Sequence, residues 1–250
     1  MDKFSRRSFV ATVGAASVAP VSALLQGPPA AAAPQNPTGP TSAVNPAKPV
    51  YLFFNLAEAA FIEAACERLI PADESGPGAL RAGVPNYLDT QLGGAWGSGE
   101  RLYRSGPWQS GSPSQGYQLP FTPAELFHTA LRAINRQLET KSTPFGALPP
   151  EAQDAFLKSL EAGALDLDGV PSAVFFDMLL RMSVEGFFSD PVYGGNRDMV
   201  AWRMIGFPGA YADYYEAIDR HGERFVREPM SIGEDGHAHI HPDPNIPARL

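Results

Sequence analysis

The chain has 250 residues, of which 44% are hydrophobic and 10% aromatic, enough to bury the core of one large domain. Its formal net charge is −8. This acidic balance argues against nucleic acid as a ligand, because affinity for phosphates comes mainly from Lys and Arg, and it gives no support for direct adhesion to an anionic membrane.

The first 32 residues have the pattern of an export signal, in which a basic start is followed by an apolar run and a stretch of small residues. Arg6 and Arg7 precede Phe9, and this order resembles a twin-arginine motif. The alternative is a chance pair of arginines in an ordinary export signal. A signal with this motif resembles the signals of proteins that are exported in the folded state. Residues 33–50 are rich in Pro, Thr, Ala and Asn without an apolar period, and are interpreted as a flexible linker.

Caps and apolar spacing then predict helices in chain order. Asn55 and Glu58 have the spacing of a capping box, and the apolar residues that follow recur every three or four positions until Pro71 ends the helix. Thr122 is a second cap, with proline at the next position and an acid at the third. The later helices are expected over 85–92, 123–139, 150–161, 171–188 and 210–220, with loops over 72–81 and 95–120.

Neither a long strand alternation nor an internal repeat is visible in the sequence, and proline (25) and glycine (24) both exceed their usual shares. The fold class predicted is therefore mostly α, an irregular helical domain with long Gly/Pro-rich loops. We expect this domain to span residues 51–235, with residues 236–250 as a mobile tail rich in His and Pro.

The sequence offers few candidates for catalysis. Cys66, the sole cysteine, cannot form an intramolecular disulfide and lies on an apolar helix face, which favours a buried thiol over a nucleophile. Neither a Gly-x-Ser-x-Gly elbow nor a nucleotide-binding glycine loop occurs. No catalytic, cofactor-binding or metal-binding residue is therefore assigned.

Two patterns leave a metal site open as an alternative. Glu125 and His128 form a Glu-x-x-His pair on one helix face, of which di-iron bundles use two copies. Only one copy occurs here, so a coincidental surface pair is the competing interpretation. His237, His239 and His241 alternate in the tail and would share one side of an extended chain, where imidazoles could bind Zn²⁺, Cu²⁺ or Ni²⁺.

The stretch from residue 185 to residue 209 is the densest in turn-forming and aromatic residues. Asp190-Pro191 and Gly194-Gly195 predict two tight turns, after which Arg197 and Asp198 could pair across the turn or cap the next segment. Three apolar residues that follow are expected in the core, namely Trp202, Ile205 and Phe207. This composition predicts a well-specified loop without an evident catalyst.

Two segments resemble the gluconate 2-dehydrogenase subunit 3 family, namely LIPADESGPGALRAGVPNYLD at 69–89 and FSDPVYGGNRDMVAWRMIGFPG at 188–209. The likeness covers roughly Asn55 to Tyr215, and the twin-arginine leader is also similar to the family's. One departure is Ala201, where family members usually carry glycine.

The resemblance implies a heteromeric dehydrogenase complex that acts on CH–OH donors. A large FAD-dependent subunit would oxidise the substrate, and a multihaem cytochrome c subunit would pass the electrons to the membrane quinone pool. A chain of this kind would have no cofactor and no activity alone, but would support folding, assembly and export of the flavoprotein through the twin-arginine translocase. The complex is expected in the periplasm, associated with the inner membrane through the partners. A ferritin-like periplasmic metalloprotein is the alternative function.

The same resemblance suggests that the 190–202 stretch contacts a partner. The candidate interface residues are Asp190, Pro191, Tyr193, Gly194, Gly195, Asn196, Arg197 and Trp202. Aromatic and arginine side chains of this kind are enriched at interfaces. The competing interpretation is that these residues only tie the chain's own helices together.

Overall fold

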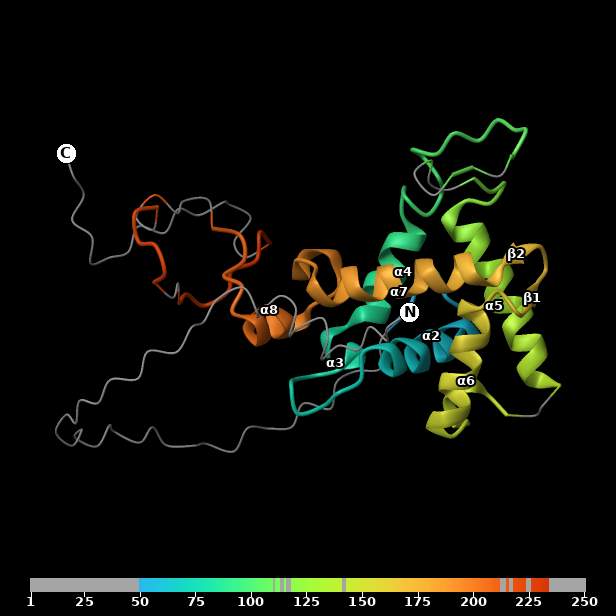
Figure 1. Cartoon of the computed structure of the whole chain (residues 1–250), viewed down its shortest axis with the longest axis horizontal. Helices are drawn as coiled ribbons and strands as arrows, with labels where there is room; N and C mark the ends of the chain where they lie inside the picture. The colour runs from blue at the N-terminus through green and yellow to red at the C-terminus, as the bar shows by residue number, and fades with distance from the viewer. Residues whose placement is uncertain are drawn as a thin grey trace. The chain divides into compact units, whose positions relative to one another are not determined.

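The computed structural model describes residues 50–233 apart from 110, 113–114, 116–117, 141–142, 212–214, 216–217 and 224–225. The described part is mostly helical, which confirms the predicted fold class (Figure 1). The predicted signal peptide with Arg6, Arg7 and Phe9, most of the linker and the histidine tail lie outside the described residues.

The elements follow one another with short strands only between α6 and α7. The helices are α2 (Leu56–Leu69), α3 (Ala79–Ala82), α4 (Val84–Gly93), α5 (Pro123–Glu139), α6 (Pro150–Glu161), α7 (Ser172–Phe188) and α8 (Val200–Ile205). The 3-10 turns are η2 (Phe145–Ala147), η3 (Pro191–Tyr193) and η4 (Arg197–Met199), and the strands are β1 (Asp166–Leu167) and β2 (Val170–Pro171).

The predicted capping box at Asn55 and the predicted cap at Thr122 are both confirmed, and Thr122 also forms a capping box. The Asn55 side chain accepts hydrogen bonds from the N–H groups of Ala57 and Glu58, while Glu58 accepts from Asn55 N at 3.0 Å. At α5 the Thr122 hydroxyl accepts from Glu125 N at 3.1 Å, and Glu125 accepts in return from Thr122 N at 2.7 Å. Each box satisfies backbone donors that a helix leaves free in its first turn, so local sequence fixes where α2 and α5 begin.

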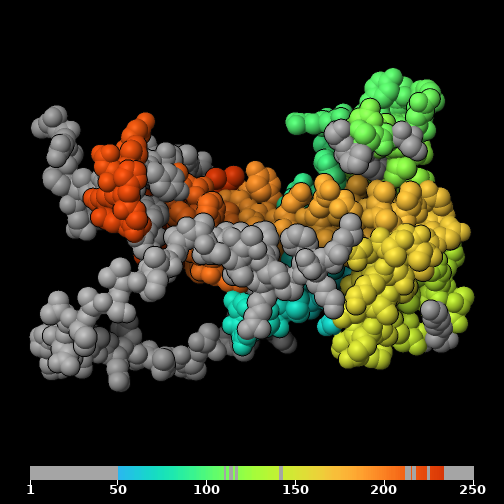
Figure 2. All heavy atoms as spheres, viewed as in Figure 1, coloured from blue at the N-terminus to red at the C-terminus, as the bar shows by residue number. Residues whose placement is uncertain are grey.

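The core lies where α7 packs against α4, α6, α5 and α2. Aromatic pairs join these helices, with Phe127 of α5 meeting Phe175 of α7 edge to face at a centroid distance of 5.2 Å. Gly186 of α7 allows a close approach to α4, because a Cβ atom there would come within 2.8 Å of the Tyr87 ring. The sequence of α7 is mostly apolar, and Leu180 and Val184 of this helix are exposed. Part of α7 is visible on the face drawn in Figure 2.

Polar contacts fix the start of the domain to this core. The Asp89 carboxylate, buried in α4, accepts hydrogen bonds from the backbone N–H groups of three successive residues, 52–54, at 2.9–3.0 Å. Arg68 of α2 donates two hydrogen bonds to Asp154 of α6, at 2.6 and 2.7 Å, and this pairing lowers the pKa of the Asp154 carboxyl.

The structure differs from the sequence-based expectations at several places. Residues 79–82 form the single turn of α3, although 79–81 were expected in a loop, and 200–205 form α8. In contrast, the described residues of the predicted 210–220 helix are not α-helical; the remainder of that prediction lies outside the described residues. The β1–β2 hairpin was missed because each strand is only two residues long, too short for an alternating pattern.

Candidate functional site

The candidate site is the 190–209 segment, which leaves the C-terminal end of α7 and contains η3, η4 and α8. Asp190 is the first anchor. Its carboxylate accepts from Val192 N at 3.0 Å, from the Ser231 hydroxyl at 2.5 Å and from Ile232 N at 2.9 Å. The Asp190 side chain thus caps η3 and also holds residues 231–232 against the segment.

Asn196 is the second anchor and is fully buried. Its side-chain amide donates to the Ser189 carbonyl and accepts from Ala201 N, both at 2.9 Å, while its own N–H donates to the Gly186 carbonyl at 3.0 Å. Asn196 has φ +43°, a left-handed conformation that asparagine tolerates better than most residues. The residue therefore joins η4 and α8 to the end of α7.

The backbone after Asn196 stays in the same unusual region. Asp198 has φ +56° and Met199 has φ +52°. A left-handed Met is uncommon, and such conformations persist only where surrounding contacts impose them. Here Asp198 pairs with Arg81 of α3 at 2.8 Å, and the Met199 side chain is buried. The expected Arg197–Asp198 pair is not formed, because the carboxylate turns to Arg81 instead.

Backbone hydrogen bonds to Met230 hold the C-terminal end of the segment. Ala210 N donates to the Met230 carbonyl at 2.8 Å, and Met230 N donates to the Pro208 carbonyl at 3.1 Å. Gly209, with φ +79°, has no room for a side chain, since a Cβ atom would lie 2.2 Å from the Met230 carbonyl oxygen. Contacts between distant residues therefore fix both ends of the segment.

The eight predicted interface residues fall into two groups. The side chains of Asn196 and Trp202 are buried, with the Trp202 indole N–H donating to the Phe188 carbonyl at 2.8 Å, and Gly195 is buried as well. These three tie the segment to α7. Tyr193 and Arg197 are exposed, and Asp190, Pro191 and Gly194 are half-buried.

Sequence reasoning missed the apolar surface around this segment. Ile205 and Phe207, expected in the core, are about half exposed, and Phe207 meets the Trp202 ring edge to face. Val192 is also exposed and lies close to Gly233, next to exposed Ile232. The exposure of Ile205 at the last turn of the six-residue helix α8 was not expected, because the sequence pattern did not predict that helix.

The Glu125–His128 pair has other partners. Glu125 belongs to the α5 capping box and contacts Arg104 at 3.3 Å, and these contacts lower its carboxyl pKa. His128 Nδ1 lies 2.9 Å from the buried Glu58 carboxylate, and its ring stacks on Phe53. Among the residues that the structure describes, no three His, Cys, Asp or Glu side chains are grouped so that they could hold a metal ion.

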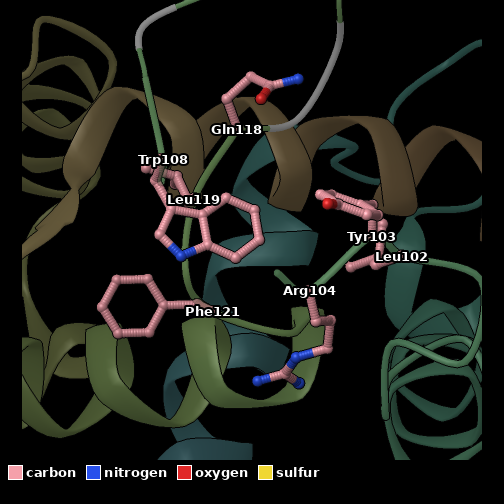
Figure 3. Close-up of a pocket in the computed structure, with 7 residues that line it drawn as sticks. All are labelled: Leu102, Tyr103, Arg104, Trp108, Gln118, Leu119 and Phe121. Carbon is pink, nitrogen blue, oxygen red and sulfur yellow. The ribbon is translucent and has the colours of Figure 1, made fainter. Parts of the chain in front are cut away.

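A small cavity lies in the loop between α4 and α5 (Figure 3). Trp108 and Phe121 line one side of it, and Tyr103 and Arg104 the other. Its volume is about 80 Å³, well below the roughly 300–1,000 Å³ of typical ligand sites. A space of this size accommodates a single side chain or a few water molecules.

A larger groove of about 500 Å³ lies between α2, α5 and η2. Its lining is mainly apolar, with Phe61, Leu138 and Phe145 among the larger side chains, and Glu139 is the one titratable residue among the described residues that line it. The described lining therefore offers a surface for apolar groups and no converging set of catalytic side chains.

Cys66 is buried against Ser183, with 3.5 Å between the sulfur and the hydroxyl oxygen. Burial raises the pKa of the Cys66 thiol to about 12. Since the thiolate is the reactive form, its population at pH 8 falls roughly a thousandfold relative to an ordinary thiol. We therefore expect Ellman's reagent to label the native chain very slowly at pH 8 and promptly in 6 M guanidinium; prompt labelling of the native chain would contradict the burial described.

The comparison with protein families matches the model of gluconate 2-dehydrogenase subunit 3 over residues 57–209, more than half of the chain. The match begins in the first turn of α2 and ends at Gly209, where the 190–209 segment closes. The comparisons with curated proteins and with solved structures returned no match. Within the described ranges, no helix is both long and apolar enough to cross a membrane.

Proposed function

The chain belongs to the gluconate 2-dehydrogenase subunit 3 family, and from this membership we propose that it is the non-catalytic small subunit of a periplasmic, membrane-associated dehydrogenase complex. Its partners are a large FAD-dependent subunit, which oxidises a CH–OH group of a sugar or sugar acid, and a multihaem cytochrome c subunit. FAD and haem c belong to those partners. The chain's own task is to support folding, assembly and export of the flavoprotein.

The observation that carries this proposal is the character of the 190–209 segment. The segment is held from both ends by Asp190 and by the pairing of Gly209 with Met230, so its shape is set before a partner arrives. Around it, exposed apolar side chains stand beside exposed Tyr193 and Arg197. A rigid surface that combines apolar, tyrosine and arginine side chains is typical of a protein interface.

The leader supplies the second part of the proposal. Arg6, Arg7 and Phe9 give the chain a signal for export in the folded state. A flavoprotein that acquires FAD in the cytoplasm could then cross the membrane bound to this chain, through the twin-arginine translocase, without a leader of its own. The small subunit would thereby couple assembly to export.

Replacing both Arg6 and Arg7 by lysine tests this coupling. We expect the flavoprotein and its dehydrogenase activity to remain in the cytoplasm, whereas the wild-type chain brings both to the periplasmic fraction. Replacing Lys3 by arginine, a change of the same chemical kind outside the pair, serves as the control. Normal export of the flavoprotein with the lysine pair, or failure of any flavoprotein to co-purify with the wild-type chain, would overturn the proposal.

A further inference from the structure

The interface proposed above contains one cationic group whose charge the described part of the chain does not neutralise. The Arg197 side chain is exposed and makes no ion pair or hydrogen bond to any described residue. The neighbouring carboxylates are engaged, Asp198 with Arg81 and Asp190 with Ser231 and Ile232. The chain has a net charge of −8, yet Arg197 pairs with no carboxylate among the described residues. Its guanidinium is therefore available to bind another molecule.

Arg197 is also held in place. The backbone before it is fixed by buried Asn196, and the Asp198–Arg81 pair holds the backbone after it. Its guanidinium lies over Gly83, in the turn between α3 and α4, where a Cβ atom would come within 3.4 Å of Nη2. Gly83 has φ +75°, so the turn favours glycine at this position.

The surroundings of the guanidinium include exposed apolar surface. The Gly194 carbonyl oxygen lies 3.3 Å from the position that a Cβ atom on Gly83 would occupy. Because the guanidinium lies near the same position, it is close to the end of η3. The two residues before Gly194 are the exposed Val192 and Tyr193. Arginine and tyrosine are among the residues in which interface hot spots are enriched, so exposed Arg197 and Tyr193, with three residues and a turn between them, can contribute to one contact surface.

We infer that Arg197 binds a carboxylate of the flavoprotein partner, an Asp or Glu side chain flanked by apolar residues that pack on Tyr193 and Val192. The inference rests on the function proposed above. Guanidinium and carboxylate match in shape and charge and form two parallel hydrogen bonds, which an ammonium cannot reproduce. Arg197 is exposed in the free chain, so the pair would lose water only when the partner covers it, and complementary charges of this kind contribute mainly to partner choice.

The test uses flavoprotein dissociated from the purified wild-type complex and then titrated with each variant of this chain. Arg197→Glu is expected to weaken binding at least about 10-fold, and Arg197→Lys to weaken it by a smaller factor, because the point charge remains but the fork is lost. Arg132→Glu is the matched control. Arg132 is exposed on α5 and also lacks an ion pair among the described residues, so this change should leave binding within about twofold.

The possible outcomes separate the two proposals. If the wild-type chain yields no flavoprotein complex, the proposed function is wrong. If the complex forms and Arg197→Glu binds as tightly as Arg132→Glu, the carboxylate contact is wrong while the function stands. Thermal unfolding shows whether each variant is folded; should Arg197→Glu fail to fold, Arg197→Lys and Arg197→Gln decide, and undiminished binding by both would overturn the inference.

Discussion

Replacing Asn196 by alanine is expected to destabilise the protein by about 4 kcal/mol and to lower Tm by roughly 10 °C. Three losses combine. The buried Ala201 N–H loses its acceptor, the Ser189 carbonyl loses its donor, and alanine is less tolerant of φ +43°. Asn196→Gly should recover about 1 kcal/mol of this loss, because glycine adopts the left-handed conformation without strain while leaving both hydrogen bonds absent.

Asn135→Ala is the matched control for Asn196. Asn135 is half-buried within α5, and its side chain makes no hydrogen bond to a described residue. Alanine has the higher helix propensity, so this change should alter the free energy of unfolding by no more than about 0.5 kcal/mol. Urea or thermal unfolding of the three variants measures the differences. Equal stability of Asn196→Ala and Asn135→Ala would show that the 190–209 segment does not depend on Asn196.

Replacing Gly195 by alanine is expected to cost at least about 3 kcal/mol. An added Cβ atom would lie 2.1 Å from the Gly186 carbonyl oxygen and 2.7 Å from the Ser189 hydroxyl. The first of these is backbone of α7 and cannot move aside without breaking the hydrogen bond from Asn196 N to Gly186. The end of α7 and the 190–209 segment should therefore separate, and binding of the flavoprotein should fall together with stability.

Gly93→Ala provides the comparison for this second change. Gly93 lies in the last turn of α4, and a Cβ atom there meets Phe53 at 3.5 Å, an ordinary contact distance. We expect Gly93→Ala to be neutral or slightly stabilising, because alanine has the lower conformational entropy when unfolded. A Tm for Gly195→Ala within about 2 °C of the Gly93→Ala value would contradict the close approach of Gly195 to α7.

Local signals in the sequence predicted the larger helices and several of their boundaries. The capping boxes at Asn55 and Thr122 and the prolines at 71, 123 and 171 act within a single turn of chain, so their effect can be read without knowing what else is nearby. The burial of Cys66 followed from the three- and four-residue spacing of apolar positions in α2. The resemblance of the two dense motifs to the family is likewise a property of sequence alone, and the family match confirms it.

Only the tertiary structure decided the conformation and exposure of the 190–209 segment. Its shape depends on partners far away in the chain, such as Ser231 for Asp190 and Arg81 for Asp198. In this segment Asp198 and Met199 adopt left-handed conformations that local preferences disfavour, and Ile205 and Phe207 lie at the surface although both are strongly apolar. A sequence pattern records what each residue favours by itself, whereas side-chain exposure is decided by which distant segments come to cover it.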